Sequence, residues 1–323
     1  MSNEDVKQVL DLGRAIEITE QALRDHSQDR VIWSTPEDLA IKPAEGWQSW
    51  VTGCALLTET VAGFRIRSIK AAGGSRDLSR PPRGPRRILI LSDREGGEIR
   101  AIMDEDWCHA VRTAAAATVA LRLLARKGAA TMAMLGAGDT ARAAVPVTAK
   151  AFSLKEIRVT SRTPESRQNY AREISKEYSL NVRPVDSTEE ALKGADLVVS
   201  ATTTSTPFVK SAWLAEGVTA YSIGKNQEME SEFYKQADKF VVDSWLHCKN
   251  KSDMQRMLKE NFLSEKDLYA ELPELLSGKK PARQSDHERI FIRAIGLVNQ
   301  DIALANWIYC CALEKGVGTR LPY

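Results

Sequence analysis

The feature that most constrains the fold is a glycine-rich turn between a short apolar run and a helical pattern. Residues 131–135 read Thr-Met-Ala-Met-Leu, as a buried parallel strand requires, and Gly136-Ala-Gly138 follows directly. The first glycine permits a tight turn, and the second lets the backbone approach a pyrophosphate. A helix starting here, with Asp139 and Thr140 in its first turn, would direct free N–H groups towards phosphates. This pattern predicts a Rossmann dinucleotide-binding domain; an ordinary turn in another doubly wound fold is the alternative.

The predicted secondary structure differs between the parts of the chain before and after this turn. From the turn onward, strand-like runs alternate with helical patterns, which indicates a parallel sheet with helices on both faces. The expected strands are residues 131–135, 156–160, 181–184, 196–200, 219–223 and 239–243. The earlier part reads as α+β, with a helix over 4–27, loop-like residues 28–50, strands over 52–57 and 61–69, and a hairpin joining 87–91 to 99–103. The sequence therefore predicts an α/β fold with a Rossmann sheet beside an α+β region.

Length, charge and cysteine content exclude several classes of protein. A chain of 323 residues suits about two domains, and a net charge of +2 gives no reason to expect a nucleic acid or an anionic membrane as partner. The polar N-terminus has no secretory h-region, and no apolar run approaches the ~20 residues of a membrane span. The five cysteines form no CxxC pair, and the four histidines show no metal-ligand spacing. We therefore expect a cytoplasmic protein with reduced thiols and no metal.

The end of the second predicted strand bears on which dinucleotide binds. A site for NAD usually has an acidic residue here, whereas an arginine accommodates the 2′-phosphate of NADP. Here Arg162 stands between the hydroxyls of Ser161 and Thr163. This favours NADP(H), with NAD(H) as the alternative if Arg162 is only a solvated loop residue.

Two further strand ends should lie under the cofactor, because parallel strands end at the same edge of a sheet. After the fourth strand the chain reads Ala201-Thr202-Thr203, small and hydroxyl residues that suit the floor of such a site. Ile223 ends the fifth strand and is a further candidate contact.

Several segments of the chain resemble the ornithine cyclodeaminase/mu-crystallin family. The similar segments are residues 101–116, 123–138, 194–202, 270–278 and 296–305, in the order and spacing of that family. Within it, residues 242–248, 270–272 and 316–323 resemble the siderophore-pathway branch that oxidises N-(2-amino-2-carboxyethyl)-glutamate.

The resemblance implies a domain arrangement and a reaction. A Rossmann domain, residues 113–294, would be inserted in a substrate-binding and dimerisation domain made of residues 1–112 and 295–323. The protein would be a homodimer, and hydride would pass between a nicotinamide and the α-carbon of an amino or imino acid.

The resemblance also nominates residues for substrate. Arg112 matches the family's carboxylate-binding arginine, and a guanidinium can grip a carboxylate with two bonds. At the position of the family's lysine stands Arg65, with Lys70 as the alternative if the alignment is shifted. An arginine cannot exchange a proton near neutral pH, whereas a desolvated lysine can. His109, one helical turn before Arg112, is interpreted as more structural than catalytic.

Other positions near the expected site depart from the family or stay ambiguous. Asn226 or Lys225 stands where the cyclodeaminases have an aspartate, and Asn226 cannot act as a base. Lys225 is a candidate proton donor or a solvated loop residue, and Glu228 is a candidate for the displaced acid. We interpret Arg67 as a solvated basic residue on an edge strand. The arginine-rich loop 73–87 either meets a substrate with several carboxylates or is simply solvated.

Three functions follow as hypotheses. The leading one is an NAD(P)H-dependent oxidoreductase acting on CH–NH or CH–NH2 groups, an imine reductase or amino-acid dehydrogenase. The second is a cyclodeaminase-type lyase that recycles its cofactor, against which Asn226 argues. The third is a non-catalytic NADPH and small-ligand binder.

Overall fold

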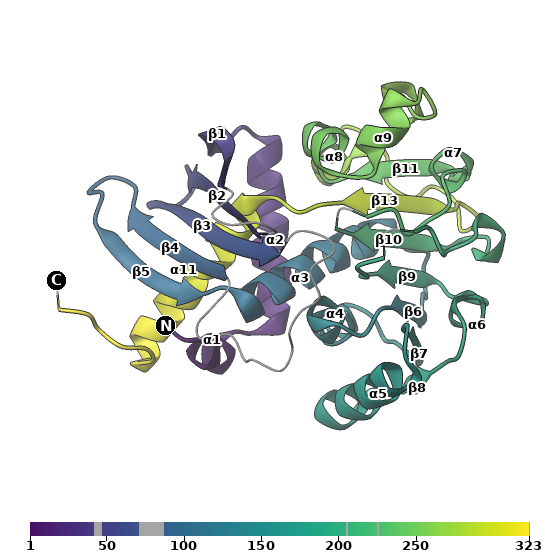
Figure 1. Cartoon of the computed structure of the whole chain (residues 1–323), viewed down its shortest axis with the longest axis horizontal. Coiled ribbons are helices and arrows are strands. Elements are labelled where there is room, and N and C mark those ends of the chain that lie inside the picture. Colours follow the sequence, from purple (N-terminus) through teal and green to yellow (C-terminus); the bar gives the residue numbers. More distant parts are fainter. Residues whose placement is uncertain (42–46, 71–86, 205, 225, 323) are drawn as a thin grey trace. The chain divides into compact units, whose positions relative to one another are not determined.

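Two compact units make up the chain. The computed structural model describes residues 1–41, 47–70, 87–204, 206–224 and 226–322 (Figure 1). Unit 1 comprises Met1–Arg112 and Leu297–Tyr323, and unit 2 comprises Thr113–Gly296. The helix α3, Asp106–Leu124, contributes its first turns to unit 1 and the rest to unit 2.

Unit 2 is built on an eight-stranded sheet in which every pairing is parallel. Its spatial order is β12-β11-β13-β10-β9-β6-β7-β8. The strands are β6 (Thr131–Leu135), β7 (Glu156–Thr160), β8 (Val182–Pro184), β9 (Leu197–Ser200), β10 (Thr219–Ile223), β11 (Lys239–Val242), β12 (Ala270–Glu271) and β13 (Ile290–Ala294). From β8 to β13 this is the 3-2-1-4-5-6 order of the Rossmann fold, so the predicted fold class is confirmed.

Helices fill the connections of this sheet, and three of them begin at a residue whose side chain accepts a hydrogen bond from the first turn. Thr163, Ser187 and Ser244 each accept from the backbone N–H three residues later. The helices of this unit after α3 are α4 (Asp139–Ala149), α5 (Pro164–Tyr178), α6 (Thr188–Leu192), α7 (Phe233–Gln236), α8 (Trp245–Lys251), α9 (Met254–Lys259) and α10 (Leu272–Leu276).

One central strand of unit 2 was not expected from the sequence. β13 lies between β10 and β11, although 239–243 was predicted as the last strand of the sheet. The sequence of this strand contains a charged residue, Arg293, which is typical of a surface segment. The Arg293 side chain is nevertheless fully buried, and Asp253 neutralises it, with Oδ1 2.6 Å from Nη2. A buried ion pair therefore permits a charged residue at the centre of the sheet.

Unit 1 is an antiparallel sheet of five strands in sequence order, with helices against one face (Figure 1). The strands are β1 (Val31–Ile41), β2 (Trp47–Leu56), β3 (Val61–Lys70), β4 (Arg87–Asp93) and β5 (Ile99–Asp104). The helices are α1 (Asn3–Val9), α2 (Leu12–Ser27) and α11 (Val298–Lys315), with the start of α3.

Three expectations for unit 1 were wrong. The helix over 4–27 is interrupted at Leu10, because Asp11 caps a new helix by accepting from the backbone N–H of Arg14 at 2.7 Å. The loop over 28–50 instead contains β1 and the start of β2, whose tryptophan-rich pattern lacked clear alternation. Arg67 is on the central strand of the sheet, because β3 has β2 on one side and β4 on the other.

The two faces of the unit 1 sheet differ in burial. On β3, Val61, Gly63 and Arg65 point to the face covered by α11, and a Cβ on Gly63 would lie 2.7 Å from Ile302 Cδ1. Phe64, on the opposite face, is 39% exposed. Within the described ranges, no helix has the length and apolarity needed to cross a membrane.

Candidate functional site

The glycine turn of unit 2 has the geometry that a dinucleotide needs. Gly136 has φ +113°, and a Cβ there would lie 2.6 Å from the carbonyl oxygen of Ala201, so a side chain is excluded. Gly138 is the N-cap of α4 and offers no capping side chain, so the first amides of the helix stay available. Asp139 and Thr140 form the first turn of α4. These are the features expected for a pyrophosphate at a helix N-terminus.

The predicted residues after β7 lie beside this turn. The N–H of Gly136 donates to the carbonyl of Thr160 at 2.9 Å, which ties the glycine turn to the end of β7. Of Ser161, Arg162 and Thr163, the two hydroxyl residues already have partners within the chain. Ser161 donates to the carbonyl of Thr163, and the Thr163 hydroxyl caps α5. Arg162 is exposed. It is therefore the side chain of this group that is freest to meet a phosphate.

The segment that follows β9, residues 201–203, is anchored by the buried carboxylate of Glu228. Glu228 is 1% exposed, and its Oε1 accepts from the backbone N–H and the hydroxyl of Thr202, at 2.7 and 2.6 Å. Its Oε2 accepts from the hydroxyl of Ser222 at 2.7 Å. Burial raises the pKa of Glu228, and these hydrogen bonds partly oppose that rise. Glu228 therefore orients Thr202, and the two neighbours of Thr202 in the chain are Ala201 and Thr203.

The segment after β10 carries the remaining candidates. Ile223 ends β10 and is half-buried, and Asn226 is exposed. The backbone carbonyl of Asn226 accepts from Arg293 Nη2 at 3.1 Å, which anchors this segment to β13. Lys225 lies outside the described residues.

In unit 1, five side chains from β3, α3, α11 and the residue before α3 form what we call the charged cluster: Arg65, Glu105, His109, Arg112 and Asp301. Its centre is Asp301 on α11, which accepts from Arg112 Nε at 2.6 Å and from Arg65 Nη1 at 2.9 Å. Arg65 Nε also lies 2.9 Å from Glu105 Oε1. Both carboxylates are fully buried, and both arginines are at most 5% exposed. The structure thus brings together Arg65 and Arg112, which the sequence predicted as carboxylate ligands.

The electrostatics of the cluster favour an ionised Asp301 and a neutral His109. Burial alone would raise the pKa of Asp301, but the guanidiniums of Arg112 and Arg65 outweigh it and hold that pKa well below its usual value. Burial, with the charges of the same two arginines, lowers the pKa of His109.

The position of His109 fits a neutral ring. Its Nδ1 lies 3.0 Å from Arg112 Nη2, 3.2 Å from Arg65 Nη2 and 3.3 Å from Asp301 Oδ1. Because guanidiniums can only donate, we assign Nδ1 as the acceptor for the two nearer arginines and place the proton on Nε2. His109 therefore helps to orient the two arginines.

Glu105, His109 and Asp301 also place three ligand atoms within 4.8 Å of one another. Each of the two carboxylates already has a guanidinium nitrogen within 2.9 Å, so the arrangement favours ion pairing over a metal cation, and we assign no metal here.

Some predicted residues are only partly described. Lys70 ends β3, paired with Trp47, but its side chain lies outside the described residues, as does the loop over 71–86. Arg87 begins β4 directly opposite Arg67. Arg67 packs over Trp50 with 5.0 Å to the ring centroid. Burial and the charge of Arg65 lower the pKa of Arg67 to about 10.

Sequence reasoning missed the acidic members of the cluster. Glu105 directly precedes α3, four residues before His109, and Asp301 is 189 residues after Arg112. The one signal available was the pattern Glu105-x-x-x-His109-x-x-Arg112, which places three polar side chains on one face of a helix otherwise rich in alanine.

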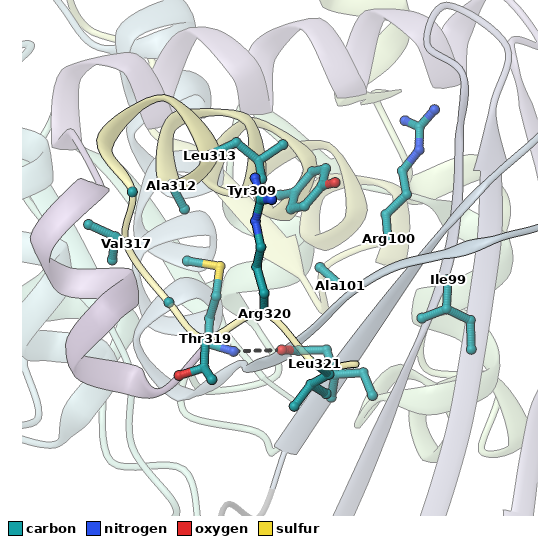
Figure 2. Close-up of a pocket in the computed structure, with 14 residues that line it drawn as sticks. Ile99, Arg100, Ala101, Tyr309, Ala312, Leu313, Val317, Thr319, Arg320 and Leu321 are labelled. Carbon is teal, nitrogen blue, oxygen red and sulfur yellow. Dashed lines mark hydrogen bonds between the residues drawn. The ribbon is translucent and has the colours of Figure 1, made fainter. Parts of the chain in front are cut away.

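A hollow of about 820 Å³ lies elsewhere in unit 1, between β5 and the end of α11 (Figure 2). Ile99, Ala101, Tyr309 and Leu313 line it with the last residues of the described chain, and the N-terminal amine donates to the carbonyl of Ile102 at 2.8 Å. The members of the charged cluster do not line it. Its walls are made by the two chain ends, and we assign it no role in the site.

The whole chain matches proteins of known activity. The model of the ornithine cyclodeaminase/mu-crystallin family matches residues 5–316. A Δ1-pyrroline-2-carboxylate reductase of Bacillus cereus is 26% identical over 328 residues, covering 100% of this chain and 99% of the relative. An N-((2S)-2-amino-2-carboxyethyl)-L-glutamate dehydrogenase of Staphylococcus aureus is 27% identical over 72% of this chain and 70% of its own.

A solved structure extends the likeness to three dimensions. It is the Δ1-pyrroline-2-carboxylate reductase of Thermococcus litoralis in complex with NADH and L-proline, with a TM-score of 0.91, 27% identity and 99% coverage of both chains. These relatives are named as reductases or as a dehydrogenase, and the solved structure contains NADH and L-proline, in line with the reaction class that the sequence resemblance implied.

Proposed function

The chain belongs to the ornithine cyclodeaminase/mu-crystallin family, and on that premise we propose that it is an NADP(H)-dependent imine reductase or amino-acid dehydrogenase. Hydride from the nicotinamide would reach the α-carbon of an imino acid, or leave that carbon in the reverse direction. Unit 2 would hold the dinucleotide at Gly136, Gly138 and Thr202. Unit 1 would hold the substrate carboxylate at Arg112 and Arg65.

The observation that carries this proposal is the buried arginine pair. Two guanidiniums at most 5% exposed share one ionised carboxylate, Asp301, so the pair keeps the capacity to bind a second carboxylate. The buried positive charge that Asp301 alone does not neutralise is costly, and the carboxylate of a ligand would offset it. Asn226 does not titrate, which favours reduction or oxidation over deamination.

The test follows NADPH oxidation with Δ1-pyrroline-2-carboxylate and with 2-oxo acids plus amines. We expect turnover with at least one imino acid. No turnover across neutral, acidic and basic members would reject the proposal. Ammonia release from ornithine without net dinucleotide change would indicate a cyclodeaminase instead, and tight NADPH binding without any reaction would indicate a binding protein.

Arg112→Lys should separate charge from geometry. The lysine keeps a cation beside Asp301 but loses the planar fork that grips a carboxylate. We expect kcat/KM for the imino acid to fall about 10- to 100-fold, the size of a lost charge-assisted hydrogen bond, with NADPH affinity unchanged. Arg122→Lys, at an exposed position of the same helix, serves as the control. Equal loss in both variants would contradict a specific role.

Arg162 is proposed to select NADP(H) over NAD(H). Arg162→Asp should lower the ratio of kcat/KM for NADPH to that for NADH by about 10- to 100-fold, because the 2′-phosphate loses a charge-assisted bond. Arg172→Asp makes the same charge change at another exposed position, on α5, and should leave the ratio unchanged. An unchanged ratio in Arg162→Asp would show that the arginine is only solvated.

We also propose that a second copy covers the outer face of the unit 1 sheet, making a homodimer. Phe64, Ile90 and Ile102 lie side by side across β3, β4 and β5 on this face. Phe64 and Ile102 are each 39% exposed, an apolar row that suits a two-fold, self-complementary contact. We expect dimers by sedimentation velocity at micromolar concentration and a shift to monomer in Phe64→Asp. A monomeric wild type would reject the contact.

A further inference from the structure

Two buried carboxylates in the charged cluster compete for one guanidinium. Arg65 on β3 contacts Asp301 with Nη1 and Glu105 with Nε, each at 2.9 Å. Both acids are completely buried, and their ligand atoms lie within 4.8 Å of each other. Two carboxylates this close and this dry resist ionising together, because each charge disfavours the other.

Hydrogen bonding decides which of the two acids holds a proton. Asp301 accepts from both Arg112 and Arg65 with good geometry. Glu105 has no such well-aligned donor among the described residues, and its nearest cation, Arg65 Nε, lies 2.9 Å from Oε1. An ionised carboxylate without hydrogen bonds is far more costly to bury than a neutral acid. The proton therefore belongs on Glu105.

The charges around Glu105 only partly offset the effect of its burial. The surrounding groups are Arg65 on β3, Arg87 on β4, Cys108, His109 and Arg112 on α3, and Asp301 on α11. Burial raises the pKa of Glu105 to about 8; Arg65 opposes the rise, and the negative charge of Asp301 adds to it. Burial also raises the pKa of the Cys108 thiol, and His109 stays neutral. Among these groups, Glu105 is thus the one whose charge changes near neutral pH.

The charge of the arginine pair follows from this proton. With Glu105 neutral, two guanidiniums face one carboxylate, and the cluster keeps one positive charge. With Glu105 ionised, the two carboxylates neutralise the two guanidiniums, and the cluster has no net charge.

We propose that Glu105 is a positioning residue whose proton keeps one positive charge on the Arg65–Arg112 pair, so that an anionic substrate binds well only while Glu105 is protonated. This inference rests on the proposed function, because it assumes that these arginines receive the substrate carboxylate. It goes beyond that function by naming the group that gates carboxylate affinity. Above the pKa of Glu105, binding of the anion takes up a proton.

The test uses the NADP+-bound protein and pyrrole-2-carboxylate, a planar carboxylate whose charge is constant between pH 6.5 and 9.5. We expect the Kd to be flat below about pH 7.5 and to weaken towards 10-fold per pH unit well above pH 8. Calorimetry at pH 9 in two buffers of different ionisation enthalpy should report uptake approaching one proton.

Glu105→Gln imitates the protonated acid. Its Kd should stay flat to pH 9.5, with no proton uptake. Glu59→Gln is the matched control, because burial also raises the pKa of Glu59 in unit 1, while its side chain accepts from Asn306 and forms no ion pair with an arginine among the described residues. Glu59→Gln should keep the wild-type pH profile. Persistence of that profile in Glu105→Gln, or a flat wild-type profile, would overturn the proposal.

A stability measurement keeps the test decisive if the variant binds poorly. Because burial on folding raises the pKa of Glu105 from its ordinary value of 4.5 to about 8, its contribution to stability is full below about pH 4.5 and is lost as pH rises to 8. Glu105→Gln should flatten this part of the pH dependence of unfolding. If pyrrole-2-carboxylate binds with proton uptake but no imino acid is reduced, the gate stands and the proposed activity fails.

Discussion

Asp301→Asn is expected to lower the free energy of unfolding by about 3 kcal/mol, because it removes the carboxylate that neutralises two buried guanidiniums. This is the lower end of the range for breaking a buried ion pair, since Glu105 can ionise in place of Asp301. Urea denaturation of the apoprotein at pH 7 measures the change. Much of the stability of an ordinary domain would be lost.

Two further variants make this result interpretable. Asp106→Asn removes a carboxylate that is 48% exposed and 3.6 Å from Arg87, and it should change stability by less than about 1 kcal/mol. Asp301→Asn combined with Glu105→Gln should be less stable than Asp301→Asn alone, because no acid remains to ionise. A mild effect of Asp301→Asn, no larger than that of Asp106→Asn, would contradict the ionic picture of the cluster.

Gly136→Ala is expected to abolish tight dinucleotide binding. The new Cβ would lie 2.6 Å from the carbonyl oxygen of Ala201, and the backbone at φ +113° is strained for any residue with a side chain. Strain of this kind amounts to about 1–3 kcal/mol, so the apoprotein itself should also lose stability. NADPH titration followed by tryptophan fluorescence measures the affinity, and urea denaturation measures the stability.

Gly138→Ala is the matched comparison. A Cβ at Gly138 meets no described atom within 4 Å, and its φ of −86° suits any residue. The apoprotein should keep its stability within about 1 kcal/mol, while NADPH affinity should fall because the methyl group occupies the approach of the pyrophosphate. Unchanged affinity in both variants would show that the phosphates bind elsewhere.

The Rossmann half of the fold was predictable because its signals are local. The apolar run before Gly136, the helix after Gly138 and the spacing to Arg162 each lie within a short stretch of chain, and the parallel sheet is confirmed. β13 was missed because its central position depends on Arg293 being neutralised by Asp253, 40 residues away in the chain. β1 was missed because strand pairing across a sheet decides its conformation more than its own pattern does.

The sequence by itself determined the dinucleotide-binding class, because the turn at Gly136 has few other uses, and it singled out Arg65 and Arg112 through their likeness to a family pattern. Only the tertiary structure decided what these arginines face. Asp301 reaches them from the far end of the chain, and Glu105 shares Arg65 with it in a site that excludes water. The charge of the cluster is a property of burial and of distances between side chains remote in sequence, and neither is written in any local pattern.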